Sequence, residues 1–166
     1  KVVGLSSGDQ IITSANTFVA SANAAEYLNA SPFFCDIDND TLNMSIIDLK
    51  EKINQLDNCK IIMPVHFAGA PCELGEIQKI AKKENMIVIE DASHALGACY
   101  KSGEMVGSCK FSDMTIFSLH PVKGVTAGEG GVITTNNIDF AKKLRLLRSH
   151  GILKGNFDLP GISKGD

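Results

Sequence analysis

Lys123 is the residue of this sequence with the clearest potential for covalent chemistry. It follows a short apolar run and precedes a glycine-rich stretch in the segment SLHPVKGVTAGEGG, residues 118–131. A lysine in such a loop is most often a solvated surface residue. A lysine that forms an imine with an aldehyde must instead be partly shielded from water, so that its amine can lose a proton. The surroundings of Lys123 decide between these two interpretations.

Other residues with chemical potential also follow apolar runs. Asp91 and His94 come after the run MIVI, Ser118 comes after the next run, and Phe18 follows the first one. Taken one at a time, each has an ordinary structural explanation. Asp91 and Ser118 are typical turn or helix-cap residues. His94 fits a satisfied polar group at a sheet edge, and Phe18 fits a core position.

Taken together with Lys123, these residues suit one chemistry. A pyridine ring that serves as an electron sink needs a carboxylate beside its nitrogen, which keeps that nitrogen protonated. An aromatic face can stack on such a ring, and a serine hydroxyl can bind its phosphate. Asp91, Phe18 and Ser118 fit these three roles beside Lys123.

Two consecutive carboxylates, Glu90 and Asp91, compete for the role beside the ring. Successive side chains of a strand point to opposite faces, so only one of the two can face a ligand. Asp91 is the expected one, because the small residues Ala92 and Ser93 follow it and leave room for a flat ring. The glycines of GEGG (128–131) are weak evidence for a phosphate loop, since the GxxxxGK[ST] spacing is missing.

These candidates need a scaffold that brings the ends of strands together, and the sequence alternates strands with helices. Strands are predicted from β-branched and apolar runs at 10–14, 33–37, 60–65, 86–89, 114–117 and 131–135. Helices are predicted from apolar residues at helical spacing at 18–28, 46–56, 73–84 and 138–148. A hairpin is predicted around 101–103.

The alternation predicts an α/β fold, a three-layer αβα domain with a mostly parallel sheet. The length is about that of one domain, so residues 1–166 are expected to form a single one. Ligands of such sheets bind beyond the carboxyl ends of the strands. If the strands before Asp91 and Ser118 are parallel, Asp91, His94, Ser118 and Lys123 lie along one edge.

Composition narrows the classes of partner. The 16 Lys and Arg against 19 Asp and Glu give a net charge of -3, which offers no general attraction to nucleic acid or to an anionic membrane. No apolar run approaches the ~18 residues that a membrane span needs. The five cysteines form no CxxC pair, so we expect reduced thiols and a cytoplasmic location. No metal site is predicted, because the histidines share no ligand spacing with the cysteines.

A resemblance to a known family runs from about Gly8 to Ile152. It rests on the motifs EDASHALGA (90–98), SLHPVK (118–123), GEGG (128–131) and LRSHGI (147–152), and on the segment 17–38. These stretches resemble the nucleotide-sugar aminotransferases of the DegT/StrS family, which depend on pyridoxal phosphate (PLP). The first two motifs look most similar to the transaminases that make 4-amino-4,6-dideoxy sugars on the route to pseudaminic acid.

The resemblance implies the large domain of the aspartate aminotransferase fold, fold type I, with PLP as cofactor. On this basis Lys123 is the lysine that binds the cofactor covalently and moves protons, and Asp91 pairs with the ring nitrogen. Ser93 is expected to pack against the ring face opposite Phe18.

Two further cofactor contacts are implied. His94 occupies a position near the phenolic oxygen of the ring, where many relatives have glutamine, and Ser118 would contact the phosphate. The pattern departs from the family where Leu119 replaces a common Phe and where Gly124 replaces a frequent Pro. Gly124 is expected to loosen the loop that holds Lys123.

The resemblance also implies parts that this chain does not include. Family members carry an upstream segment that binds the phosphate and a downstream small domain, and they form homodimers in which the neighbouring subunit completes the site. The expected reaction is transfer of an amino group, with glutamate as donor, to the keto group of a nucleotide-linked deoxy-sugar.

Two alternatives remain open at the level of sequence. The same fold supports other imine reactions on sugars, such as epimerisation or aldol cleavage, although a sugar dehydratase would have histidine in place of Lys123. A non-catalytic or regulatory module that binds a ligand without turnover is the second alternative.

Overall fold

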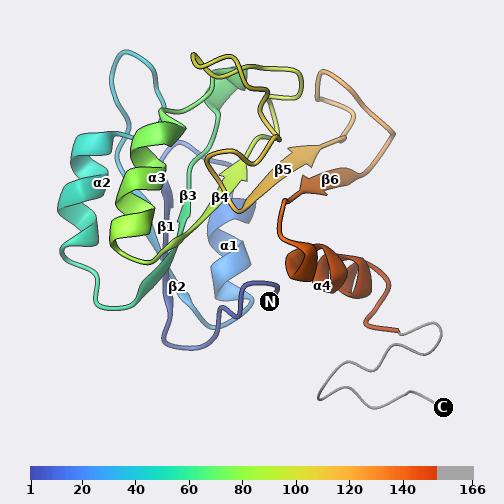
Figure 1. The fold of residues 1–166 in the computed structure, drawn as a ribbon, viewed down its shortest axis with the longest axis horizontal. Helices are drawn as coiled ribbons and strands as arrows, with labels where there is room; N and C mark the ends of the chain where they lie inside the picture. The colour runs from blue at the N-terminus through green and yellow to red at the C-terminus, as the bar shows by residue number, and fades with distance from the viewer. Residues whose placement is uncertain (153–166) are drawn as a thin grey trace.

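The computed structural model describes residues 1–152 and shows one six-stranded sheet flanked by helices (Figure 1). The strand order is β2-β1-β3-β4-β5-β6. The first five strands run parallel and β6 runs antiparallel to β5. The strands are β1 (Gln10–Ser14), β2 (Ser31–Cys35), β3 (Cys59–Met63), β4 (Ile87–Asp91), β5 (Met114–Ser118) and β6 (Gly131–Thr134). Residues 153–166, the end of the predicted single domain, lie outside the described residues.

Helices cover both faces of the sheet, which gives three layers. They are α1 (Ala20–Glu26), α2 (Ile46–Ile53), α3 (Leu74–Lys83) and α4 (Ile138–Arg148), with a short 3-10 helix η1 (Phe67–Gly69). Helices α2 and α3 pack on one face, and α1 and α4 lie on the other (Figure 1). The predicted α/β fold with a mostly parallel sheet is therefore confirmed.

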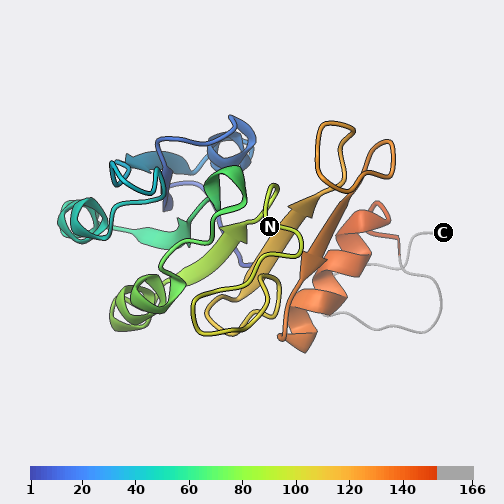
Figure 2. The same cartoon turned by 90° about the horizontal axis from the view of Figure 1, so that it is seen from above.

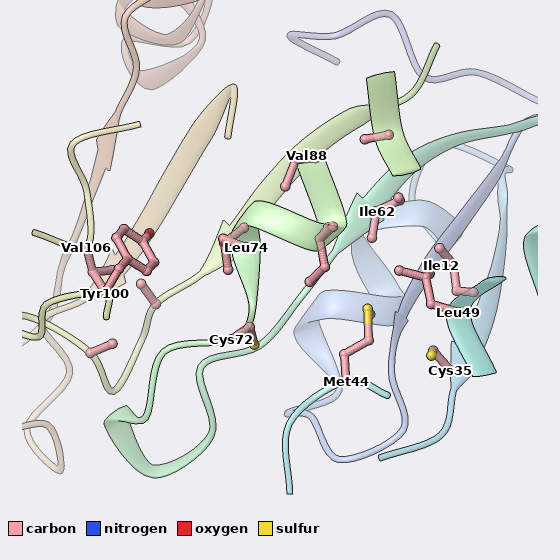
Figure 3. Close-up of a cluster of buried hydrophobic side chains, with 14 of the residues drawn as sticks. Ile12, Cys35, Met44, Leu49, Ile62, Cys72, Leu74, Val88, Tyr100 and Val106 are labelled. Carbon is pink, nitrogen blue, oxygen red and sulfur yellow. The ribbon is translucent and has the colours of Figure 1, made fainter. Parts of the chain in front are cut away.

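The larger core lies between the sheet and the α2 and α3 layer (Figure 3). Ile12, Ile62 and Val88 point from three neighbouring strands toward Leu49 of α2 and Leu74 of α3. Each of these five side chains is at most 2% exposed. Burial of each aliphatic side chain contributes roughly 1.5–3 kcal/mol of transfer free energy, so this layer is the main source of apolar stabilisation.

The opposite face carries the residues that alternate with this core along the strands. Ile11 and Ile61 pack with Ala25 of α1 in a second cluster, and Leu144 of α4 contacts it from the side. No residue of α4 is buried within the described part of the chain. This face is thus more thinly covered than the α2 and α3 face.

Two helices begin at the predicted residue because a side chain caps each one. The Ser45 hydroxyl accepts a hydrogen bond from the backbone N–H of Asp48 at the start of α2. The side-chain oxygen Oδ1 of Asn137 accepts hydrogen bonds from the backbone N–H groups of Asp139 and Phe140 at the start of α4. Such caps satisfy backbone donors that a helix leaves unpaired, and each contributes about 1 kcal/mol.

Other predicted boundaries move by a few residues. Strand β2 begins at Ser31 and includes Pro32, which is tolerated because β2 is an edge strand and a proline there forfeits no ladder hydrogen bond that the sheet needs. Helix α1 is shorter than predicted, and Asn29 turns the chain out of it with a φ of 55°. The predicted hairpin around 101–103 is a tight turn closed by one antiparallel bridge between Cys99 and Met105.

The parallel strands bring their carboxyl ends to one edge of the sheet, as predicted. At this edge the segment 119–130 leaves β5 and returns as β6, and it projects beyond both strands (Figure 2). Its base is closed by the Leu119 N–H, which donates to the Gly130 carbonyl at 2.9 Å. None of the helices formed by residues 1–152 has the length and apolar character needed to cross a bilayer.

Candidate active site

A cleft of about 610 Å³ opens at the carboxyl edge of the sheet. Its walls come from the start of α1, the ends of β3, β4 and β5, and the loop 119–130. All six residues that the sequence predicts as site residues line this one cleft: Phe18, Asp91, Ser93, His94, Ser118 and Lys123. The structure therefore gathers residues that lie more than a hundred positions apart in the sequence.

Asp91 is the last residue of β4 and presents its carboxylate to the cleft. The Ser21 hydroxyl donates to Oδ2 at 2.9 Å. The Ser93 hydroxyl and backbone N–H donate to Oδ1 at 2.6 and 3.1 Å. Asp91 thus makes the turn contact expected of an aspartate after a strand, and both its oxygens are fixed in place while it faces the cleft.

Glu90 points away from the cleft into the α2 and α3 face. It is completely buried and accepts hydrogen bonds from His66 Nε2 at 2.7 Å and Thr115 Oγ1 at 2.8 Å, as well as from the hydroxyls of Tyr100 and Ser112. Burial alone would raise the pKa of Glu90, but these hydrogen bonds outweigh it and hold the pKa below its ordinary value. The two adjacent carboxylates therefore separate as the alternation of strand side chains predicts.

Lys123 lies on the loop after β5 and is held at the cleft wall. Its Nζ is 2.8 Å from Nε2 of His94, which lies on the turn after β4. One proton lies between these two nitrogens, because either the ammonium donates to a neutral imidazole or an imidazole N–H donates to a neutral amine. The backbone N–H of Lys123 donates to the His120 carbonyl at 2.9 Å and fixes the start of its turn.

Phe18 and Ser118 lie at two other positions of the cleft wall. The Phe18 ring precedes α1 and is 75% exposed, so it is an unburied aromatic face at the cleft rather than a core residue. Ser118 ends β5, and its hydroxyl oxygen accepts the His120 N–H at 3.3 Å. That contact leaves the hydroxyl proton of Ser118 for donation to a ligand.

Sequence reasoning missed two residues of this site, Ser21 and His66. Ser21 lies one helical turn after Phe18 and donates to Asp91. His66 lies three residues beyond the end of β3 and is part of the cleft wall. Its ring is hydrogen-bonded to Glu90. The position of His66 just beyond a strand was the available signal, whereas the contact of Ser21 joins residues 70 positions apart and had none.

In the described part of the chain, three residues with charged side chains line the cleft: Asp91 at the end of β4, and Lys123 and Glu129 on the loop after β5. Asp91 is paired with hydroxyl and backbone donors and Lys123 with an imidazole, and these two side chains form no ion pair with each other within residues 1–152. A ligand can therefore meet a carboxylate, an amine and an aromatic face at once. This set can bind a carbonyl compound through the amine while the carboxylate pairs with a cationic part of it.

Comparison with known proteins finds similarity to one family of aminotransferases, both in sequence and in structure. Residues 1–159 match the model of the DegT/DnrJ/EryC1/StrS aminotransferase family. The chain is 43% identical to GDP-perosamine synthase of Escherichia coli O157:H7 over 135 aligned residues. The aligned region covers 81% of this chain and 36% of that protein. The chain therefore spans little more than a third of the length of this relative.

Solved structures show the same similarity in three dimensions. The PseC aminotransferase of Helicobacter pylori, involved in the biosynthesis of pseudaminic acid, superimposes with a TM-score of 0.83 at 37% identity, over 91% of this chain and 40% of that one. NtdA from Bacillus subtilis, solved with the bound cofactor PMP, superimposes with a TM-score of 0.81 at 32% identity, over 91% of this chain and 33% of that one.

The turn that carries His94 is packed against the backbone of η1. Gly69 has a φ of 88°, and a Cβ added to it would lie 2.9 Å from the His94 carbonyl oxygen. Gly97, on the other side of the same turn, has nearly the same φ of 86° but open space around it. The two glycines therefore separate backbone strain from steric contact.

We expect Gly69→Ala to destabilise the protein by about 2–4 kcal/mol, because left-handed strain and a clash with a backbone carbonyl add together. Gly97→Ala introduces the strain alone and is expected to cost about 1–2 kcal/mol. Urea unfolding of both variants measures the difference. Equal losses would show that the His94 turn is not held by its contact with Gly69.

Proposed function

The chain belongs to the DegT/DnrJ/EryC1/StrS aminotransferase family and has the fold of PLP-dependent enzymes of fold type I; from this premise we propose that it acts in amino transfer to a nucleotide-linked sugar. The observation that carries the proposal is the meeting of Lys123, His94 and Asp91 in one cleft. The chain spans 36% of the perosamine synthase it matches, so we propose that it is the cofactor-binding part of a large domain, and that a phosphate-binding segment and a small domain complete the full-length protein.

The residues of the cleft fit PLP by their chemistry. PLP supplies an electron sink when it is bound, and the protein supplies its orientation and charge. The ring nitrogen requires a fixed carboxylate, and Asp91 has both oxygens already oriented by Ser21 and Ser93. The Phe18 ring is exposed for stacking, and the hydroxyl of Ser118 is available for a phosphate oxygen.

Lys123 supplies the amine that binds the cofactor and later moves protons. Its Nζ is hydrogen-bonded to His94, so a proton that leaves the amine has an acceptor at 2.8 Å. This contact keeps the proton within the site and aims the amine into the cleft. The Ser93 hydroxyl donates to Asp91. We propose that the Cβ of Ser93 packs against the face of the PLP ring opposite Phe18.

The substrate class follows from the relatives and not from a sugar-reading residue in this chain. We assign a nucleotide-linked keto-sugar as amino acceptor and glutamate as amino donor. We also propose a homodimer located in the cytoplasm, with the neighbouring subunit completing the cleft. Similarity to GDP-perosamine synthase and to PseC supports the acceptor class.

Lys123 is expected to carry the cofactor covalently. Borohydride reduction of the PLP-loaded full-length protein, followed by peptide mapping, should place the label on Lys123. Lys123→Ala should abolish turnover while retaining non-covalent PLP, whereas the control Lys101→Ala, on a side chain that is 88% exposed, should leave both unchanged. A label on Lys60, Lys101 or Lys110 would contradict the assignment.

The amino acceptor is expected to be a nucleotide-linked keto-sugar. The full-length protein should transfer an amino group from glutamate to one or more members of a panel of 4-keto and 3-keto nucleotide sugars, with the product followed by mass spectrometry. Turnover confined to simple keto acids would refute the acceptor class. Bound PLP without any turnover would instead favour the non-catalytic module.

A further inference from the structure

A second carboxylate, Glu90, lies directly behind the cleft, and the proposed reaction gives it no role. Its side chain is inaccessible to solvent and receives four hydrogen bonds, from His66, Thr115, Tyr100 and Ser112. A buried carboxylate is costly to place in a protein interior unless its oxygens are fully paired. An apolar side chain would fill this position without such a cost, so packing alone does not explain why a carboxylate lies here.

The network fixes the protonation of its members. The Cys72 N–H donates to His66 Nδ1 at 3.0 Å, so Nδ1 carries the lone pair and Nε2 carries the proton that Glu90 accepts. Burial and the hydrogen bond to Glu90 raise the pKa of Tyr100, so its hydroxyl keeps its proton. All four partners are therefore neutral donors, and Glu90 holds a single negative charge that water does not reach.

The same histidine couples this network to the cleft. The backbone N–H of His66 donates to the backbone carbonyl of Asp91 at 3.0 Å, and the backbone N–H of Asp91 donates to the carbonyl of Pro64 at 2.9 Å. His66 thus binds Asp91 through its main chain and Glu90 through its ring. Because the two carboxylates leave consecutive residues on opposite faces, a rotation of the chain that moves one must move the other.

We propose that Glu90 is a positioning residue for Asp91: its anchored side chain fixes the end of β4 and so holds the Asp91 carboxylate toward the cleft. This inference rests on the proposed function, in which Asp91 pairs with the ring nitrogen of the cofactor. Ser21 and Ser93 set the final direction of the Asp91 oxygens, and Glu90 sets the direction of the residue. The other titratable side chains that line the cleft are His94, His120, Lys123 and Glu129, and the His66 ring is buried behind it against Glu90.

The test compares the protonation of the ring nitrogen of bound PLP in three full-length variants, followed by the 15N chemical shift of cofactor labelled at that nitrogen as a function of pH. Glu90→Gln keeps the shape of the side chain, but it removes the charge and turns one acceptor into a donor. A less well-aligned Asp91 stabilises the protonated ring nitrogen less, so the midpoint of its titration should move to lower pH by on the order of one unit. Asp91→Asn should move it further in the same direction. The control Ile77→Ala creates a cavity in α3 and should lower stability without moving the midpoint.

The outcomes separate the two proposals. Wild-type protein without PLP absorbance would overturn the proposed function, and this inference with it. PLP bound to Glu90→Gln with a wild-type midpoint, or an equal shift in Ile77→Ala, would overturn the positioning role alone. If Glu90→Gln does not fold, Thr115→Val removes one donor and leaves the carboxylate. A smaller shift to lower pH in that variant supports the role, and an unchanged midpoint contradicts it.

Discussion

The separation of two adjacent carboxylates at the end of β4 is the constraint on which the site depends. Glu90 enters the protein interior and Asp91 enters the cleft, as consecutive residues of a strand must. Parallel neighbours hold this strand on both sides, since Asp91 is in register with Ile116 of β5 and bridges to Val65 after β3. The direction of Asp91 is therefore a property of the sheet and not of one loop.

Lys123 is positioned by weaker means than Asp91. It lies on a loop that is closed at its base by Leu119 and Gly130 and tightened by the Ala127 N–H, which donates to the Leu119 carbonyl. The contact with His94 ties this loop to the turn after β4. A rigid carboxylate and a tethered amine suit a site in which the amine must move when it binds and releases a ligand, while the carboxylate stays in place.

Much of this arrangement could be read from the sequence because it is governed by local periodicity. The strand alternation predicted that only one of Glu90 and Asp91 faces the cleft, and the small residues after Asp91 indicated that it is Asp91. The parallel α/β pattern predicted that Ser118 and Lys123 would meet Asp91 at one edge. The contact from Ser21 to Asp91 and the pairing of His66 with Glu90 could not be read in this way. Both join segments whose spacing is set by packing, and neither residue type is unusual at its position.

The proposed function requires that the cleft orient a PLP ring between Lys123 and Asp91. A crystal structure of the full-length protein with PLP bound tests it most directly. We expect electron density continuous from the Lys123 Nζ into the cofactor, with an Asp91 oxygen within hydrogen-bonding distance of the ring nitrogen. Density joined to another lysine, or a ring nitrogen turned away from Asp91 toward Ser118, would contradict it.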